Sequence, residues 1–295
     1  MRFRPPTLAD ADRIVALLVA CDIADFGAPD YDRDALLAEW ETPGVDLAAD
    51  GFVTDGAYGL LLGTDGRAWV HPEYRGRGLG AALAGRLEAR ARERGLAYLD
   101  QQMPRRDTAG RALLEARGYS LVRSYADMRL PDTAVGALPV GNVRPYEPGR
   151  DTDAVQRVVE RAFEDGAGRV EPLEVVLARH PDTTLWFVAD AADGSLAGAL
   201  RAELRPAGFI TGYITQVATE PAHRGRGIGS ALIGVAARAM VARGAVTIRL
   251  HVRSSNPDAL RLYERLGFSG RWEADELRLA LAPWPKAAEY REISG

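Results

Sequence analysis

Two stretches of the sequence, HPEYRGRGLGAALA at residues 71–84 and EPAHRGRGIGSALI at residues 220–233, are versions of one motif, 149 residues apart. The same interval separates LLEARGY at residues 113–119 from LYERLGF at residues 262–268. The residues between the motifs therefore align without a gap, and similarity at a fixed interval is the signature of a repeated structural unit. The sequence predicts one fold that occurs twice in the chain.

The repeat divides the 295 residues into two predicted domains, 1–136 and 137–295. Between them, LPDTAVGALPVGN at residues 130–142 is rich in proline, glycine and small residues and carries little charge, which is typical of a linker. The mixture of strands and helices in each copy predicts the α/β class, with an α+β type of mixed sheet. In the second copy we expect strands at 185–189, 197–204, 210–218, 246–252 and 276–281, and helices from 228 and from the cap Asn256 to Gly267.

The composition is that of an ordinary globular protein, with 47% hydrophobic residues, 26% charged residues and a formal net charge of −4. That charge lacks the basic excess typical of nucleic-acid binding, and no apolar run approaches the roughly 20 residues that span a bilayer. The histidines stand far apart without metal-ligand spacing, so we expect no metal. Cys21 is the single cysteine, and no signal peptide is evident. We expect a cytoplasmic monomer or homodimer with no nucleic-acid or membrane partner.

The glycine motif joins a predicted strand to a predicted helix. Backbone N–H groups without intrahelical partners and the helix dipole favour an anion there, and glycines allow close approach and positive φ. We therefore predict a diphosphate cradle in each copy. It comprises Arg224, Gly225, Arg226, Gly227, Ile228, Gly229 and Ser230 in the second copy, and Arg75, Gly76, Arg77, Gly78 and Gly80 in the first.

Two other interpretations of the motif stay open. One is a glycine-rich turn with solvated arginines. The other is the dinucleotide fingerprint of a dehydrogenase, because Gly76, Gly78 and Ala81 have its spacing and Asp100 lies 22 residues beyond Gly78. That fingerprint requires an apolar strand that runs directly into the first glycine, whereas HPEYR precedes it here. The second copy also lacks the acid.

These residues resemble the GNAT superfamily of acyl-CoA-dependent N-acyltransferases, whose pyrophosphate loop reads Gln or Arg, two residues, Gly, one residue, Gly or Ala. Residues 224–229 and 75–80 both fit that loop. The family's second block, Asn-x-x-Ala-x-x-Leu-Tyr-x-x-x-Gly-Phe, occurs in full at 256–268. The resemblance covers nearly all of both copies and implies a tandem GNAT protein, an arrangement also seen in mycothiol synthases. Tyr213 stands where their strand-borne catalytic glutamate would fall, which argues against that substrate.

The resemblance implies transfer of an acetyl group from acetyl-CoA, the cosubstrate, to a primary amine of a small molecule or peptide, by direct attack in a ternary complex. It implies that main-chain N–H groups of Val217, Ala218 and Thr219 bind pantetheine, with Ala218 as the oxyanion donor. Tyr263 is then the acid that protonates the departing thiolate. Asn256 is expected to cap a helix, to contact the cofactor, or both.

His251, on the strand before the last helix, is the candidate general base, because an imidazole titrates near neutral pH. Glu203, Tyr213 or a chain of water molecules are the alternatives.

Two functions other than acetyl transfer stay open, a non-catalytic acyl-CoA sensor and a structural or partner-binding protein. Retention of Tyr263 argues against the sensor.

The first copy is predicted to be catalytically silent. The interval of 149 residues carries the acid onto Leu114, the base onto Gln102 and the cap onto Asp107. Neither leucine nor glutamine can perform the proton transfer expected at its position, although the glycines of the cradle are kept.

Acceptor specificity is expected in the first helices and their loops, residues 20–40 and 163–180.

Overall fold

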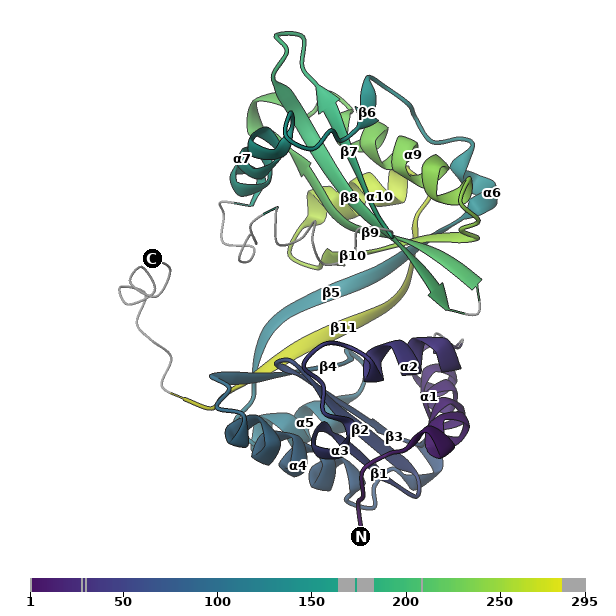
Figure 1. The fold of residues 1–295 in the computed structure, drawn as a ribbon, viewed down its shortest axis with the longest axis vertical. Coiled ribbons are helices and arrows are strands. Elements are labelled where there is room, and N and C mark those ends of the chain that lie inside the picture. Colours follow the sequence, from purple (N-terminus) through teal and green to yellow (C-terminus); the bar gives the residue numbers. More distant parts are fainter. Residues whose placement is uncertain are drawn as a thin grey trace. The chain divides into compact units, whose positions relative to one another are not determined.

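The computed structural model describes residues 2–27, 29, 31–163, 173, 183–207 and 209–282. They belong to two compact units (Figure 1). The first unit combines Met1–Tyr125 with Trp272–Gly295, and the second unit is Ala126–Arg271. These bounds differ from the predicted domains 1–136 and 137–295, because two strands each begin in one unit and end in the other.

The first unit is built on a sheet flanked by helices. Its elements are α1 (Ala11–Phe26), α2 (Arg33–Trp40), α3 (Leu47–Asp50), β1 (Gly51–Thr54), β2 (Ala57–Leu62), β3 (Asp65–Val70), α4 (Leu79–Glu93), β4 (Tyr98–Pro104), α5 (Thr108–Ala116), the start of β5 (Ser120–Pro131) and most of β11 (Ser269–Ala280). The strand order is β1-β2-β3-β4-β11-β5. The meander β1 to β3 is antiparallel, and β3 touches β4 in parallel.

The second unit repeats this plan. Its elements are the end of β5, α6 (Asp132–Val135), β6 (Val143–Pro145), α7 (Thr152–Ala162), β7 (Thr184–Asp190), β8 (Leu196–Ala207), β9 (Phe209–Thr219), the 3-10 turn η3 (Pro221–His223), α9 (Ile228–Val241), β10 (Thr247–Arg253) and α10 (Pro257–Arg265). The strand order is β5-β10-β9-β8-β7-β6. The predicted strands and helices of this copy are present, and β11 begins at Ser269 rather than at residue 276.

The strands β5 and β11 are exchanged between the units. In the sequence β5 ends the first copy, yet its residues from Ala126 onward belong to the second unit, where β5 neighbours β10. In turn β11 ends the second copy but pairs with β4 of the first unit, in antiparallel register from Ala274 opposite Pro104 to Ala280 opposite Tyr98. Each unit therefore contains a strand that the other repeat encodes.

The segment 130–142, predicted as a linker, packs on α9 instead. Leu138 is buried in the core of the second unit, and Arg238 of α9 donates a hydrogen bond to its carbonyl oxygen at 2.6 Å. A Cβ added at Gly234 would lie 1.9 Å from the Pro139 carbonyl oxygen. Glycine at position 234 thus allows the segment 130–142 to pack closely on α9.

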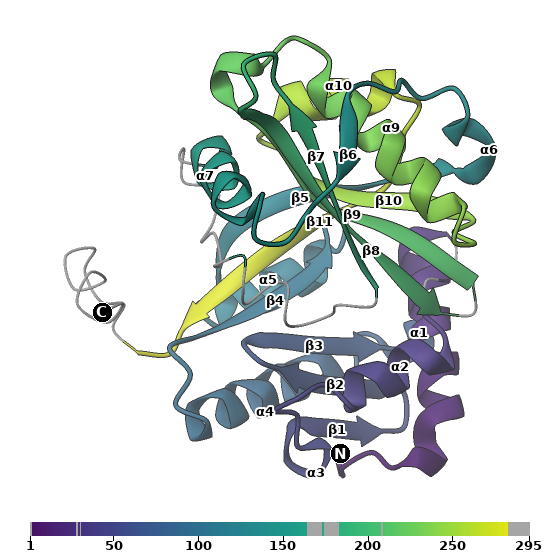
Figure 2. The ribbon, with the colours of Figure 1, turned by 45° about the horizontal axis from the view of Figure 1, so that its top comes forward.

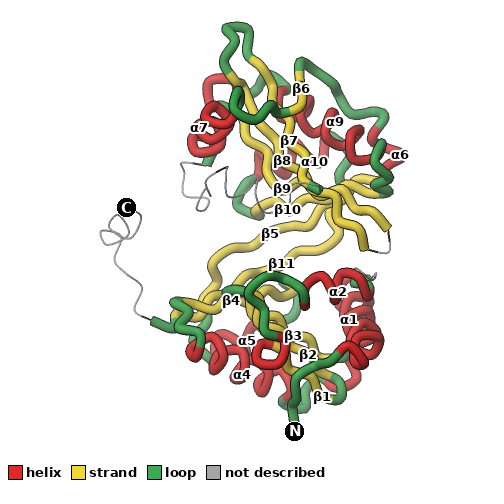
Figure 3. Tube along the Cα trace, viewed as in Figure 1, coloured by secondary structure: helices red, strands yellow, loops and turns green. Residues whose placement is uncertain are grey.

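Helices cover both faces of each sheet. In the second unit, Ala199 of β8 packs with α7, whereas the next residue, Leu200, packs with α9, because side chains alternate along a strand. Figure 2 shows α7 and α9 on opposite sides of β7 and β8. In the first unit Leu60 packs with α1 and α2 and Leu61 with α4, and Figure 3 shows these helices flanking the strands.

Candidate active site

The strands β9 and β10 part within the sheet of the second unit. Their parallel register runs from Thr211 opposite Thr247 to Ile214 opposite Leu250. Immediately afterwards the pairing of β9 with β8 shifts by one residue at Thr215, whose hydroxyl accepts a hydrogen bond from Arg201 Nε at 2.7 Å. A bulge bends its strand. The rest of β9 continues to Thr219 with β8 as its partner, which leaves a gap on the β10 side.

The backbone of β9 presents alternate amides to this gap. The N–H of Glu220 donates to the Ala197 carbonyl oxygen of β8 at 2.9 Å. In an antiparallel pair, residues that face the partner alternate with residues that face away, so Ala218 faces β8 while Val217 and Thr219 face the gap. The amide of Ala218, the expected donor, is therefore directed to β8, whereas the amides of Val217 and Thr219 are directed to the gap. The sequence could not show this, because the direction of an amide depends on strand register.

The glycine loop leads from β9 into α9. Gly225 and Gly227 have φ of +75° and +78°, the left-handed region that favours glycine, and Gly227 caps α9. No atom lies within 4 Å of a Cβ built at either position, so the requirement for glycine is conformational rather than a matter of packing within the chain. The first amide of α9 with an intrahelical partner is that of Ala231, bonded to Gly227 at 3.0 Å. The amides of Ile228, Gly229 and Ser230 are therefore open to a ligand.

Gly229 marks the point where the elements of the site converge. A Cβ at this position would lie 3.6 Å from Leu262 of α10, 3.7 Å from the Thr219 hydroxyl and 4.0 Å from Val217. The end of β9, the first turn of α9 and α10 thus meet at one place. Tyr263 follows Leu262 on α10, is 9% exposed and has its ring 5.8 Å from that of Phe268. Burial raises the pKa of the Tyr263 phenol to about 12, so it keeps its proton at neutral pH.

Asn256 caps α10 as the sequence predicts. Its side-chain oxygen accepts a hydrogen bond from the amide of Ala259 at 3.1 Å, and Pro257 occupies the first helical position. The cap alone accounts for this residue in the chain. A contact between Asn256 and the cofactor stays a prediction.

His251 lies on β10 and faces away from α9. Its neighbours Leu250 and Val252 are buried in the core with α9, whereas the His251 side chain is 39% exposed. The imidazole Nε2 is 3.2 Å from Oδ2 of Asp127 on β5, and the Tyr213 ring stands edge-on at 5.3 Å. Sequence analysis missed Asp127. The signal was available, because a carboxylate interrupts the apolar pattern of β5 between Ala126 and Met128.

The two side-chain alternatives to His251 are engaged with arginines. Both carboxylate oxygens of Glu203 are in ion pairs, at 3.4 Å from Arg201 and 3.2 Å from Arg205. The Tyr213 ring lies under the guanidinium of Arg205, 4.0 Å from its centre. Both alternatives thus have cationic partners on β8, whereas His251 contacts the carboxylate of Asp127.

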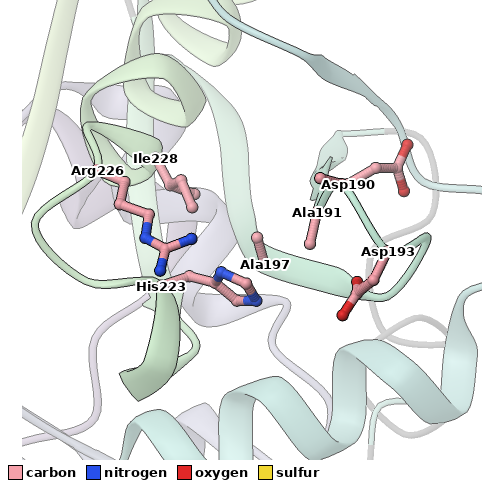
Figure 4. Close-up of a pocket in the computed structure, with 8 residues that line it drawn as sticks. Asp190, Ala191, Asp193, Ala197, His223, Arg226 and Ile228 are labelled. Atoms are coloured by element: carbon pink, nitrogen blue, oxygen red, sulfur yellow. The ribbon is translucent and has the colours of Figure 1, made fainter.

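A cavity of about 360 Å³ borders the glycine loop on the side of the turn between β7 and β8 (Figure 4). Two residues of the predicted cradle, Arg226 and Ile228, line one wall together with His223. Asp190 and Asp193 lie across from them. The cavity borders the predicted cradle, and neither Tyr263 nor His251 lines it.

The comparisons with known proteins agree with this geometry. The model of the acetyltransferase (GNAT) family matches residues 62–119 and 155–268. The chain belongs to the GNAT acetyltransferase family. It is an acyltransferase of a family whose cosubstrate is an acyl-CoA, which removes the dehydrogenase interpretation.

Three GNAT relatives illustrate the similarity. A mycothiol acetyltransferase of Thermobispora bispora is 32% identical over 292 residues, covering 91% of this chain and 95% of that protein. The crystal structure of a GCN5-related N-acetyltransferase from Sphaerobacter thermophilus has a TM-score of 0.78 at 27% identity, covering 96% of both chains. A tandem GNAT protein from the clavulanic acid biosynthesis pathway shares the fold, with a TM-score of 0.68 at 15% identity over 96% of this chain and 99% of that chain.

The GNAT loop of the first unit has other surroundings. Gly76 and Gly78 have φ of +75° and +81°, and Gly78 caps α4. Arg75, however, is held by both carboxylate oxygens of Asp25 at 2.8 and 2.7 Å and donates to the Val70 carbonyl oxygen at 3.2 Å. At the other positions carried across by the repeat, Leu114 is buried, Gln102 is exposed, and Asp107 caps α5 through the amide of Gly110 at 2.8 Å.

Some sequence predictions fall on residues that the structure does not describe. Of the segment expected to set acceptor specificity in the second copy, 163–180, only Phe163 and Leu173 are described. Within the described ranges, no group of three or more histidine, cysteine or acidic residues could hold a metal ion. No helix in the same ranges is long and apolar enough to cross a membrane.

Proposed function

We propose that the second unit transfers an acetyl group from acetyl-CoA to the primary amine of a small molecule or peptide, by direct attack in a ternary complex. The observation that carries the proposal is the convergence at Gly229. The side chains of Val217 and Thr219 on β9, the first turn of α9 and Leu262 of α10 meet there. Diphosphate binding would then fall to α9, carbonyl polarisation to the amides of Val217 and Thr219 that face the gap, and thiolate protonation to Tyr263, the residue after Leu262.

The first turn of α9 would hold the diphosphate of acetyl-CoA. Its open amides and the helix dipole favour an anion. Arg224 and Arg226 are exposed on the loop before it. Arg224 makes no side-chain hydrogen bond or ion pair with the residues that the structure describes, so its guanidinium can turn to a phosphate.

The amides of Val217 and Thr219 would polarise the thioester carbonyl and stabilise the oxyanion. His251 takes a proton from the amine as the nitrogen bonds to the carbonyl carbon. When the tetrahedral intermediate collapses, the carbon–sulfur bond breaks, and Tyr263 gives its proton to the thiolate. Exchange with solvent returns both side chains to their starting states.

The acceptor is the less constrained part of the proposal. Relatives are named mycothiol acetyltransferases, so their acceptor is the reference compound for this chain. At the place on β9 next to His251, however, the chain presents the phenol ring of Tyr213 rather than a carboxylate. We propose that the enzyme prefers a different primary amine.

An acceptor screen tests the function. The full chain is incubated with acetyl-CoA and a panel of amines that includes the reference acceptor, while thiol release and the mass of the product are followed. We expect thiol release that depends on the amine and is lost in Tyr263→Phe. Calorimetric binding of acetyl-CoA without turnover on any amine would favour the non-catalytic sensor instead.

A further inference from the structure

Asp127 is a fully buried carboxylate beside the candidate base. It lies on β5 with a relative exposure of 0%. Its Oδ2 is 2.8 Å from Arg249 Nη2 and 3.2 Å from His251 Nε2. Its Oδ1 is buried and has no hydrogen-bond partner among the described residues. A buried carboxylate carries a large desolvation cost and is weak evidence for a stabilising role, so its position next to His251 needs another explanation.

The carboxylate next to His251 is already paired with a cation. Asp127 contributes one negative charge and Arg249, on the same strand as His251, one positive charge. The Tyr213 phenol of β9 faces the ring, and the Arg205 guanidinium of β8 lies over Tyr213. The carboxylate can therefore fix the ring without adding net charge to the Asp127–Arg249 pair, and a neutral ring is the form that accepts a proton.

The contact with Asp127 also determines which ring nitrogen carries the proton and which carries the lone pair. Nε2 is directed to Asp127, and a carboxylate at this distance favours a proton on that nitrogen. The lone pair is then on Nδ1, on the other side of the ring. The edge-on Tyr213 ring limits rotation. A carboxylate that orients an imidazole in this way supports proton transfer without being protonated itself.

We propose that Asp127 is a positioning residue that holds His251 in the orientation and tautomer in which Nδ1 takes the proton of the attacking amine. This inference rests on the proposed function, in which His251 is the base. Asp127 belongs to the first repeat by sequence and to the second unit by packing. The silent copy therefore supplies a residue that the active site of the other copy requires.

The first unit offers a matched control. Glu276 lies at the position of Asp127 in the repeat, on the exchanged strand β11, and is 2% exposed. It pairs with Arg123 at 2.8 Å and stands opposite Gln102, which has no basic nitrogen. Glu276→Gln thus removes a buried strand carboxylate of the same kind without touching an imidazole.

The first experiment compares Asp127→Asn with Glu276→Gln in the full chain. For Asp127→Asn we expect kcat to fall by about tenfold or more with little change in KM for acetyl-CoA. The acidic limb of the kcat/KM profile should move to lower pH, because the carboxylate that faces the imidazole becomes a neutral amide. For Glu276→Gln we expect an unchanged profile. A lower Tm in both variants with neither profile moved would reduce Asp127 to a structural residue.

A double-mutant cycle separates action through His251 from other effects. Asp127→Asn should cost nothing further in kcat once His251→Gln is present, whereas additive losses would overturn the proposal. If Asp127→Asn fails to fold, the imidazole nitrogen resonances of the wild-type protein decide. The resonances of His251 are assigned as those that disappear in His251→Gln. In the neutral form they should show the proton on Nε2, and a proton on Nδ1 would contradict the inference. Absence of turnover on every amine would instead count against the proposed function and leave the tautomer measurement valid.

Discussion

The loops that precede α4 and α9 have nearly the same backbone and different partners. Their paired glycines differ in φ by only a few degrees. In the first unit Arg75 is bound by Asp25 and the Val70 carbonyl, whereas Arg224 in the second makes no such bond with the described residues. The comparison teaches that a repeat can keep the backbone of a glycine loop while the partner of its arginine changes: among the described residues, a carboxylate of the same unit holds Arg75 but not Arg224.

On the sheet face beside α1 and α2, the first unit also pairs an arginine with a carboxylate of its own. On β3, Arg67 donates to Glu39 and, at 3.2 Å, to Tyr31, and Tyr31 also bonds Glu39. Burial raises the pKa of the Tyr31 phenol well above its usual value, so the network holds its protons in place. The first unit thus covers this face of its sheet with a hydrogen-bonded network of its own side chains.

The largest expected effect comes from replacing the capping glycine of each loop. Valine at φ near +80° is strained by about 1–3 kcal/mol, and Gly78 and Gly227 have φ of +81° and +78°, so the backbone strain is matched. We expect Gly227→Val to abolish amine acetylation and to weaken acetyl-CoA binding by at least about tenfold. Gly78→Val should leave acetylation largely intact. Calorimetry and turnover measure both, and the reverse outcome in folded variants would place the active site in the first unit.

Tyr263→Phe should lower kcat by about a hundredfold with little effect on acetyl-CoA affinity, because the hydroxyl acts on the departing thiolate. The control is Tyr119→Phe, which removes a buried phenol of the first unit that accepts a hydrogen bond from Gln101 at 3.0 Å. This control should change Tm rather than kcat. Wild-type kcat in Tyr263→Phe, where chemistry limits turnover, would exclude the phenol as the acid.

His251→Gln should remove the acidic limb of the pH–rate profile, because glutamine cannot accept the proton of the amine. Gln102, its counterpart in the first unit, already has this side chain, so Gln102→His is the converse variant and should leave the profile unaltered. Steady-state rates over a range of pH test the pair. A profile that His251→Gln leaves intact would assign the proton to another acceptor.

The smallest effect is expected from Asp25→Asn, which releases Arg75. The pair is partly exposed, with side-chain exposures of 42% for Arg75 and 20% for Asp25, so the loss of stability should be below about 1 kcal/mol. Calorimetry should detect a second, weak acyl-CoA site that the wild-type chain lacks. An unchanged stoichiometry would show that features beyond this ion pair close the first cradle.

Local chemistry made much of this structure predictable. The cap at Asn256, the positive φ of the glycine loop and the limits of β9 follow from residue types and their periodicity. The partners of β5 and β11 could not be predicted, because SYADMRL and EADELRL have similar patterns and either can complete either sheet. Asp127 and the direction of the β9 amides were missed for the same reason, since both depend on which strand pairs with which and in what register.

The exchange of β5 and β11 has an evolutionary consequence. Once a duplicated gene encodes strands that complete each other's sheets, neither copy can be deleted without leaving the survivor an open sheet edge. Fragments cut between the repeats should each expose such an edge and associate or aggregate. Selection for a complete sheet then preserves the length and fold of both copies, independently of the chemistry that each performs.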